Sequence, residues 1–158
     1  MRHELTRRDL IRNSALLLGN LCVCQKASEA SRPRSNCCNT PDLEIESLSM
    51  NEKGLTIDLA KAPSLAVVGS AANIIDPEKS LQIIVVRARK KKYYALSRLC
   101  THGNQVVSYN QKRGLLQCNN FNHAIFDLRG QVVKGPAPTP LKSYPVVMKD
   151  GKLTITIN

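Results

Sequence analysis

Two cysteine–histidine pairs contain all the cysteines and histidines in the second half of this chain. Cys100 is followed two residues later by His102. Cys118 is followed five residues later by His123, and His3 is the chain's third histidine. Thiolates and imidazoles bind two kinds of metal centre. One is a tetrahedral zinc ion, and the other is a 2Fe–2S cluster in which two histidines bind one iron. The four paired residues are therefore the candidate metal ligands.

The spacing of the pairs helps to distinguish these two centres. Structural zinc sites commonly place cysteines about two to four residues apart and histidines about three to five residues apart. Here each pair combines one cysteine with one histidine, and fifteen residues separate His102 from Cys118. This arrangement favours an iron–sulfur centre, while zinc and a scaffold that binds no metal remain as alternatives.

Each pair follows a segment with the pattern of a β-strand. Residues 93–99 lead into Cys100, and residues 115–117 lead into Cys118. Between them, the pattern predicts a strand over residues 106–109 and a turn over 111–114. Two neighbouring loops at the end of one hairpin would bring four side chains to one point, because a loop backbone can turn inward without breaking strand pairing.

Short strands separated by turns extend through the rest of the chain. Apolar residues make up 42% of the sequence, which is enough to bury a core. Alternating or dense apolar residues predict strands over residues 43–48, 54–59, 83–86, 93–96, 106–109, 115–117, 124–127, 131–133, 144–148 and 153–157. Lys149-Asp150-Gly151 is a strong hairpin signal, and Arg89–Lys92 has the pattern of a solvated hairpin turn. We therefore predict an all-β, antiparallel sandwich or barrel.

The motifs around the two pairs resemble those of Rieske iron–sulfur proteins. Cys100-Thr101-His102-Gly103 is similar to the Cys-X-His-Gly of that family. The second pair is followed by Phe126-Asp127, a short turn, and then Gly135-Pro136-Ala137 and Pro140-Leu141. The resemblance covers about residues 80–157. It implies a Rieske-like domain over residues 42–158, with a small cluster-binding subdomain at about 96–141 whose proline-rich loop covers one side of the cluster.

The resemblance implies one 2Fe–2S cluster that passes single electrons. Cys100 and Cys118 would hold one iron as thiolates, and His102 and His123 would hold the other. In the family the second histidine usually comes three residues after the cysteine, and that position is Phe121 here. A small local insertion would explain the departure and would leave His123 able to reach the iron.

Two features of the loops indicate how the cluster would be tuned. High-potential family members carry an extra cysteine in each loop and place hydroxyl groups against the cluster. Residues 103–105 and 119–122 contain no cysteine, and residues 124–126 contain no hydroxyl. We therefore expect a reduction potential in the lower or middle part of the range from about −150 to +300 mV.

Residues 1–30 have the pattern of an export signal. Thr6-Arg7-Arg8-Asp9-Leu10-Ile11 precedes an apolar run over 14–24, and Ser28-Glu29-Ala30 supplies the small residues of a cleavage site. The paired arginines resemble a twin-arginine signal, whose route carries proteins that are already folded. The apolar run is shorter than the roughly 20 residues that a membrane span needs. We expect a mature chain without a transmembrane span, in the periplasm or at the outer face of the cytoplasmic membrane, with peripheral membrane association as an alternative.

A polar linker is expected over residues 31–41. It contains Cys37 and Cys38, and neighbouring cysteines rarely pair with each other. Disulfides elsewhere, metal binding and a contact between chains all remain open for these two residues.

The charge and the motifs limit the classes of function. The net charge is +11, which could steer the protein toward an acidic partner. We expect no nucleic-acid partner, because the basic residues are scattered and lack interleaved aromatic side chains. We expect an electron-transfer subunit of an oxidoreductase rather than a complete enzyme, of the quinol–cytochrome c reductase or arsenite oxidase kind. Its partner would be a cytochrome or a larger oxidoreductase subunit. A free ferredoxin-like shuttle and a zinc-binding or cluster-less scaffold are the alternatives.

Overall fold

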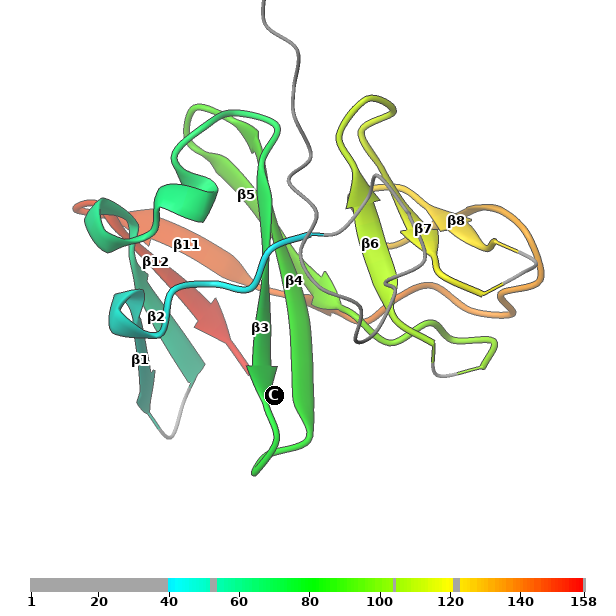
Figure 1. The fold of residues 1–158 in the computed structure, drawn as a ribbon, viewed down its shortest axis with the longest axis horizontal. Helices are drawn as coiled ribbons and strands as arrows, with labels where there is room; N and C mark the ends of the chain where they lie inside the picture. Colours follow the sequence, from blue (N-terminus) through cyan, green and yellow to red (C-terminus); the bar gives the residue numbers. More distant parts are fainter. Residues whose placement is uncertain (1–39, 52–53, 104, 121–122, 158) are drawn as a thin grey trace, which may run out of the picture. The chain divides into compact units, whose positions relative to one another are not determined.

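Twelve short strands and three 3₁₀-helices make up the regular structure of the described residues in the computed structural model (Figure 1). The structure describes residues 40–51, 54–103, 105–120 and 123–157, which all fall within one compact unit of the chain, residues 36–158. The 3₁₀-helices are η2 (Ile45–Ser47), η3 (Leu59–Lys61) and η4 (Pro63–Leu65). Within these ranges no helix is long and apolar enough to cross a membrane.

The first sheet joins strands from the two ends of the described chain. Its order is β1-β2-β12-β11, with all neighbours antiparallel. The strands are β1 (Leu48–Asn51), β2 (Gly54–Asp58), β11 (Val146–Lys149) and β12 (Lys152–Thr156). Asp150 and Gly151 link β11 to β12 with φ angles of 50° and 74°. Positive φ at both central residues is typical of the tight hairpin turn that the sequence predicts here.

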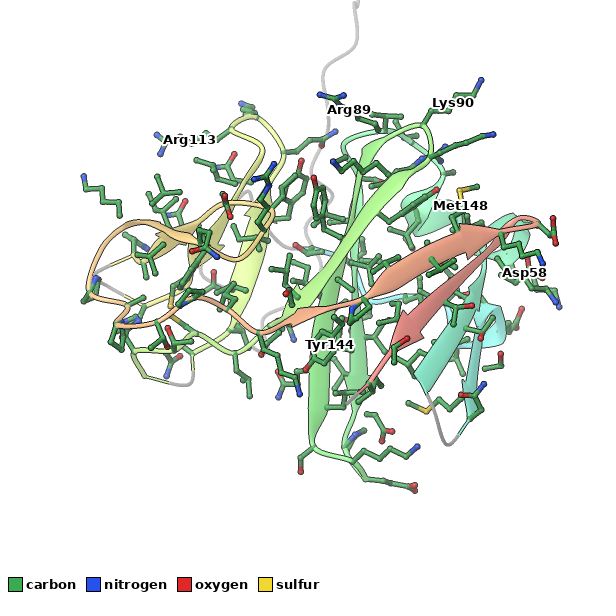
Figure 2. All side chains as sticks on the ribbon, turned by 180° about the vertical axis from the view of Figure 1, so that it is seen from behind. Asp58, Arg89, Lys90, Arg113, Tyr144 and Met148 are labelled. Atoms are coloured by element: carbon green, nitrogen blue, oxygen red, sulfur yellow. The ribbon has the colours of Figure 1, made fainter. Side chains whose placement is uncertain are left out.

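The second sheet lies between the other two sheets (Figure 1). Its order is β10-β5-β4-β3, again antiparallel. The strands are β3 (Ala71–Asp76), β4 (Leu81–Arg89), β5 (Lys92–Ser97) and β10 (Ser143–Tyr144). Arg89 pairs with Lys92, so Lys90 and Lys91 form the turn between β4 and β5. Figure 2 shows Arg89 and Lys90 projecting from the end of this hairpin, as the sequence predicts.

The third sheet carries the two cysteine–histidine loops at one end. Its strands follow one another along the chain in the order β6-β7-β8-β9. They are β6 (Val107–Asn110), β7 (Leu115–Cys118), β8 (Ile125–Phe126) and β9 (Val132–Lys134). The all-β, antiparallel architecture that the sequence predicts is therefore observed.

Strand β4 is buried on both faces and separates two hydrophobic cores. Ile83 and Val85 pack in the core between the first and second sheets. Ile84 and Val86 pack in a second core, which also holds residues of the third sheet. Successive side chains of a strand point to opposite faces, so four consecutive apolar residues are all buried here. The second core contains Cys100 and Cys118, so the two predicted cysteine ligands are anchored in the packed interior.

Two predicted strands differ from the structure, and one observed strand has no predicted counterpart. The expected strand over residues 43–48 is wrong, because residues 45–47 form η2 and β1 begins at Leu48. Strand β3 was not predicted, and its position is fixed by pairing with β4. The expected strand over 144–148 is split into β10 and β11 at Pro145, because proline has no N–H to donate to a strand ladder.

Candidate metal centre

The first metal-binding loop follows β5 and is closed by backbone contacts at its base. Leu99 pairs with Val106 in an isolated antiparallel bridge. The Cys100 N–H donates to the Gln105 carbonyl at 2.7 Å. These contacts turn the chain back on itself, so that Cys100 and His102 both lie within one tight loop.

The second loop begins where β7 ends, beside the start of β6. Cys118 is the last residue of β7 and pairs with Val107. Its N–H donates to the Ala124 carbonyl at 2.8 Å, and the His123 N–H donates to the Asn120 carbonyl at 3.0 Å. Both loops therefore lie at the same end of the third sheet, as the hairpin argument predicts.

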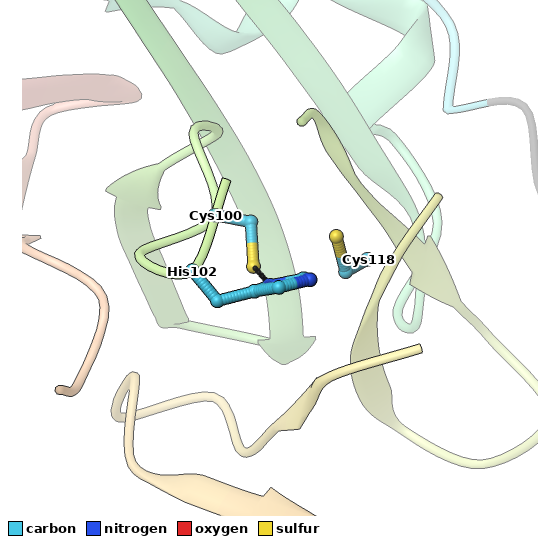
Figure 3. A group of neighbouring side chains, drawn as sticks. All are labelled: Cys100, His102 and Cys118. Carbon is cyan, nitrogen blue, oxygen red and sulfur yellow. Dashed lines mark hydrogen bonds between the residues drawn. The ribbon is translucent and has the colours of Figure 1, made fainter. Parts of the chain in front are cut away.

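Three of the four predicted ligands converge in the structure. The ligand atoms of Cys100, His102 and Cys118 all lie within 4.8 Å of one another. Cys100 Sγ is 2.8 Å from His102 Nδ1, and Figure 3 shows the Cys118 side chain beside the same imidazole. Both cysteines are buried and free of disulfides, and His102 is half-buried. Two sulfurs and one imidazole nitrogen are a donor set for an iron–sulfur or zinc centre.

His123 does not join this group in the structure. Its Nδ1 atom is 3.1 Å from the carbonyl oxygen of its own loop's Cys118, and its side chain is exposed. Its φ angle is 36°, an uncommon value for a residue with a Cβ. Residues 121–122, just before it, lie outside the described residues. The assignment of His123 as the fourth ligand stays a prediction.

Burial raises the pKa of the Cys118 thiol to about 11, and the neighbouring Cys100 thiol adds to this increase. A hydrogen bond from the Asn120 backbone acts in the opposite direction and lowers the pKa. Two thiolates this close together, away from water, repel each other unless a cation lies between them. A bound metal supplies that charge and favours the thiolate form of a cysteine. The site therefore fits a metal centre that binds both sulfurs.

The proline-rich segment over residues 135–140 contacts both loops. The Thr101 hydroxyl donates to the Thr139 carbonyl at 2.7 Å. At the other end of the segment, Gly135 has a φ of 105°, and a Cβ atom there would lie 2.7 Å from the Ala124 Cα. The resemblance implies that this segment covers one side of the cluster, and these contacts hold it against the two loops that carry the ligands.

Asn120 is a site residue that the sequence analysis did not select. Its side-chain Nδ2 is 3.2 Å from His102 Nε2, which joins the second loop to the first. The sequence signal for Asn120 was its polar side chain between Cys118 and His123. This signal is weak, because asparagine is common in loops for reasons of turn geometry alone.

Several predictions fall on residues that the structure does not describe. The twin-arginine-like signal over residues 1–30 and the linker cysteines, Cys37 and Cys38, lie outside the described ranges. The export of the chain and the roles of these two cysteines therefore stay predictions.

A family model for the Rieske 2Fe-2S domain matches residues 60–145, which is more than half of the chain. This span includes both metal-binding loops and the proline-rich segment. It lies within the domain expected from the sequence and contains all four predicted ligands.

Two curated relatives match about two fifths of the chain each. The ferredoxin subunit of the 3-phenylpropionate/cinnamic acid dioxygenase of Photorhabdus laumondii is 39% identical over 70 residues, which are 42% of this chain and 66% of the relative. The cytochrome b6-f complex iron-sulfur subunit of Chlorobaculum tepidum is 33% identical over 63 residues, which are 40% of this chain and 34% of the relative. The chain thus spans less than two thirds of either relative.

Two solved structures are similar to the chain. The ferredoxin of carbazole 1,9a-dioxygenase from Nocardioides aromaticivorans IC177 superimposes with a TM-score of 0.52 at 20% identity, covering 70% of this chain and all of that one. A plasma membrane Rieske protein from Synechocystis PCC 6803 gives a TM-score of 0.49 at 23% identity, covering 55% of this chain and 86% of that one. The first of these similarities confirms the predicted Rieske-like, all-β fold.

Proposed function

Because the chain belongs to the Rieske 2Fe-2S domain family, we propose that it carries single electrons between redox proteins. The cluster that this family binds takes up and releases one electron at a time. The observation that carries the proposal is the convergence of Cys100, His102 and Cys118 within 4.8 Å in a chain that matches this family.

We assign the two sulfurs to one iron and the two imidazoles to the other. Cys100 and Cys118 are 1% and 0% exposed, whereas His102 is half-buried and His123 is exposed. The histidine side of the centre thus lies nearest to solvent, and a partner protein would approach there. The buried cysteines would anchor the cluster in the second core, so that electrons enter and leave at the histidine edge.

The proposed role is that of an iron–sulfur subunit in a periplasmic or membrane-associated oxidoreductase, quinol–cytochrome c reductase-like or arsenite oxidase-like. The similarity to a cytochrome b6-f iron-sulfur subunit supports this role. The paired arginines at Arg7 and Arg8 support export of the folded, loaded protein by a twin-arginine route. Replacement of both arginines by lysine is expected to retain the protein in the cytoplasm, as measured by cell fractionation.

A second candidate is a free ferredoxin-like shuttle. The dioxygenase ferredoxin subunit supports it, because its identity to this chain is the higher of the two curated relatives described above. The two roles differ in how the protein is isolated from its own cells. A subunit co-purifies with a large redox partner, whereas a shuttle elutes alone in gel filtration at the mass of a single chain.

The decisive experiment is the metal content and spectrum of the purified full chain. We expect about two irons and two acid-labile sulfides per chain, and the electron paramagnetic resonance (EPR) signal of a Rieske cluster after reduction. Cys118→Ser and His102→Ala should each lose iron, whereas Ser49→Ala in β1, on the first sheet, should retain it. A colourless protein that binds zinc alone would refute the proposal.

The fourth ligand is tested by His123→Ala in the same assay. Loss of iron and of the Rieske signal is expected if His123 binds the cluster. Full iron with an unchanged signal would show that another group completes the site.

A further inference from the structure

Asn120 contacts both metal-binding loops through three of its groups. Its side-chain Nδ2 is 3.2 Å from His102 Nε2 in the first loop. Its carbonyl accepts the His123 N–H at 3.0 Å, and its backbone hydrogen-bonds the Cys118 sulfur. A single residue therefore joins the imidazole of one loop to the sulfur and the histidine of the other.

The orientation of His102 explains what the Asn120 side chain can do. His102 Nδ1 faces the Cys100 sulfur at 2.8 Å, so Nε2 is the nitrogen that faces Asn120. An imidazole binds a metal through the nitrogen that carries no proton, and its other nitrogen then carries the proton and needs an acceptor. If Nδ1 binds iron, the partner of Nε2–H must be an acceptor.

A carboxamide suits both states of this histidine. In the metal-free protein, the Asn120 NH₂ group can donate to Nε2 while Nδ1–H points at the Cys100 sulfur. With iron on Nδ1, a half-turn of the amide presents Oδ1, which accepts from Nε2–H. Leucine has a similar size but can do neither, and aspartate can only accept.

We propose that Asn120 is a positioning residue that directs His102 Nδ1 toward the iron and lowers the reduction potential of the cluster. An acceptor on Nε2–H makes the imidazole a stronger electron donor to its metal. Stronger donation favours the oxidised cluster and so lowers the potential. This inference rests on the proposed function, since it assumes a cluster ligated by His102.

The test compares Asn120→Leu and Asn120→Asp with a neighbouring control, Asn119→Leu. The Asn119 side chain is exposed and accepts from the Ser108 hydroxyl at 3.1 Å, away from the imidazole. For the loaded proteins, we would measure the reduction potential by voltammetry and the nitrogen couplings of the ligating histidines by pulsed EPR. We expect a higher potential for Asn120→Leu, a lower one for Asn120→Asp, and altered nitrogen coupling in both, with Asn119→Leu unchanged.

An unchanged reduction potential and unchanged nitrogen couplings in Asn120→Asp would overturn the inference. Because aspartate has the shape of asparagine, this variant keeps the test available if Asn120→Leu fails to fold. A wild-type chain without any cluster would instead refute the proposed function. The contact between Asn120 and His102, from which the inference starts, can be tested separately in the metal-free protein by ¹⁵N NMR of His102. Asn120→Asp should move the imidazole proton from Nδ1 to Nε2, and an unmoved proton would count against the role of Asn120.

Discussion

At the scale of single residues, the Cys118 thiol connects metal binding to stability. Burial raises its pKa to about 11, whereas an exposed cysteine has a pKa of about 8.5. Between these values the folded, metal-free chain keeps a proton that the unfolded chain loses. The unfolded state is therefore favoured as the pH rises through this window.

We expect the free energy of unfolding of the metal-free protein to fall by about 2 kcal/mol between pH 8.5 and 11, as a result of Cys118. Denaturant unfolding at a series of pH values measures this change. Cys118→Ala should lack this part of the alkaline decline while keeping the contributions of lysines and tyrosines. Parallel curves for the two proteins would contradict the prediction.

Most of the candidate site could be predicted from residue types and spacing alone. The two Cys/His pairs predict four ligands, and the structure brings the ligand atoms of Cys100, His102 and Cys118 together. Asn120 could not be selected in this way, because its partner His102 is 18 positions away and the contact depends on how two loops fold. The place of His123 depends in the same way on the path of an unusually long loop.

At the scale of elements, the strand pattern predicted β4 well and β3 not at all. The dense apolar run of β4 marks a strand covered on both faces. Strand β3 has the sequence Ala-Ala-Asn-Ile-Ile-Asp, with buried Asn73 at its centre. The Asn73 side chain donates to the Thr40 carbonyl at 2.6 Å, 33 residues away. A buried polar residue whose side-chain NH₂ group bonds so distant a partner leaves no periodic signal.

Two neighbouring residues of β4 allow the two cores to be tested separately. Ile83 packs in the core of the first and second sheets, and Ile84 packs in the core that holds Cys100 and Cys118. Ile83→Ala and Ile84→Ala should each lower the free energy of unfolding by about 2–5 kcal/mol. Only Ile84→Ala should also speed the release of iron to a chelator under native conditions. Equal release rates would show that the cysteines do not depend on the second core.

Gly135 offers a test of the proline-rich segment. Gly135→Ala places a Cβ atom 2.7 Å from the Ala124 Cα, so the segment must move away from the second loop. Gly114→Ala is the control, since Gly114 also has a positive φ, of 65°, but no atom lies within 4 Å of the added Cβ. The control should lose about 1 kcal/mol of stability through backbone strain alone.

We expect Gly135→Ala to lose more stability than Gly114→Ala and to expose the cluster to solvent. Bleaching of the visible spectrum in air measures that exposure. The idea that the segment shields the cluster would fail if both variants bleached at the wild-type rate.

At the scale of the whole molecule, positive charge gathers in the part that carries the metal-binding loops. Residues 98–142 contain one acidic residue, Asp127, and six basic residues: Arg98, Lys112, Arg113, Arg129, Lys134 and Lys142. Arg113 projects from the turn between β6 and β7 (Figure 2). Such a field attracts negatively charged partners from a distance and weakens as salt is added.

Reversing the charge of Lys134 tests this field, because Lys134 is exposed and pairs with Ile125 close behind the second loop. We expect the reduced protein to react faster with an anionic oxidant, hexacyanoferrate(III), at low than at high ionic strength. Lys134→Glu should slow this reaction at least about twofold at low salt. Lys152→Glu, in β12 of the first sheet, should have a smaller effect.

Stopped-flow kinetics with a cationic cobalt complex as the oxidant should show the opposite salt dependence. Identical salt dependence for both oxidants would contradict the prediction.

The double burial of β4 has a consequence for how this protein opens. A strand that serves as a wall of two cores cannot lose its hydrogen bonds while either core remains intact. Its amide protons should therefore exchange with deuterium only when the entire described unit unfolds, and more slowly than those of β9 at the edge of the third sheet. Local opening of the two loops would then admit or release a metal without disturbing the sheet behind them.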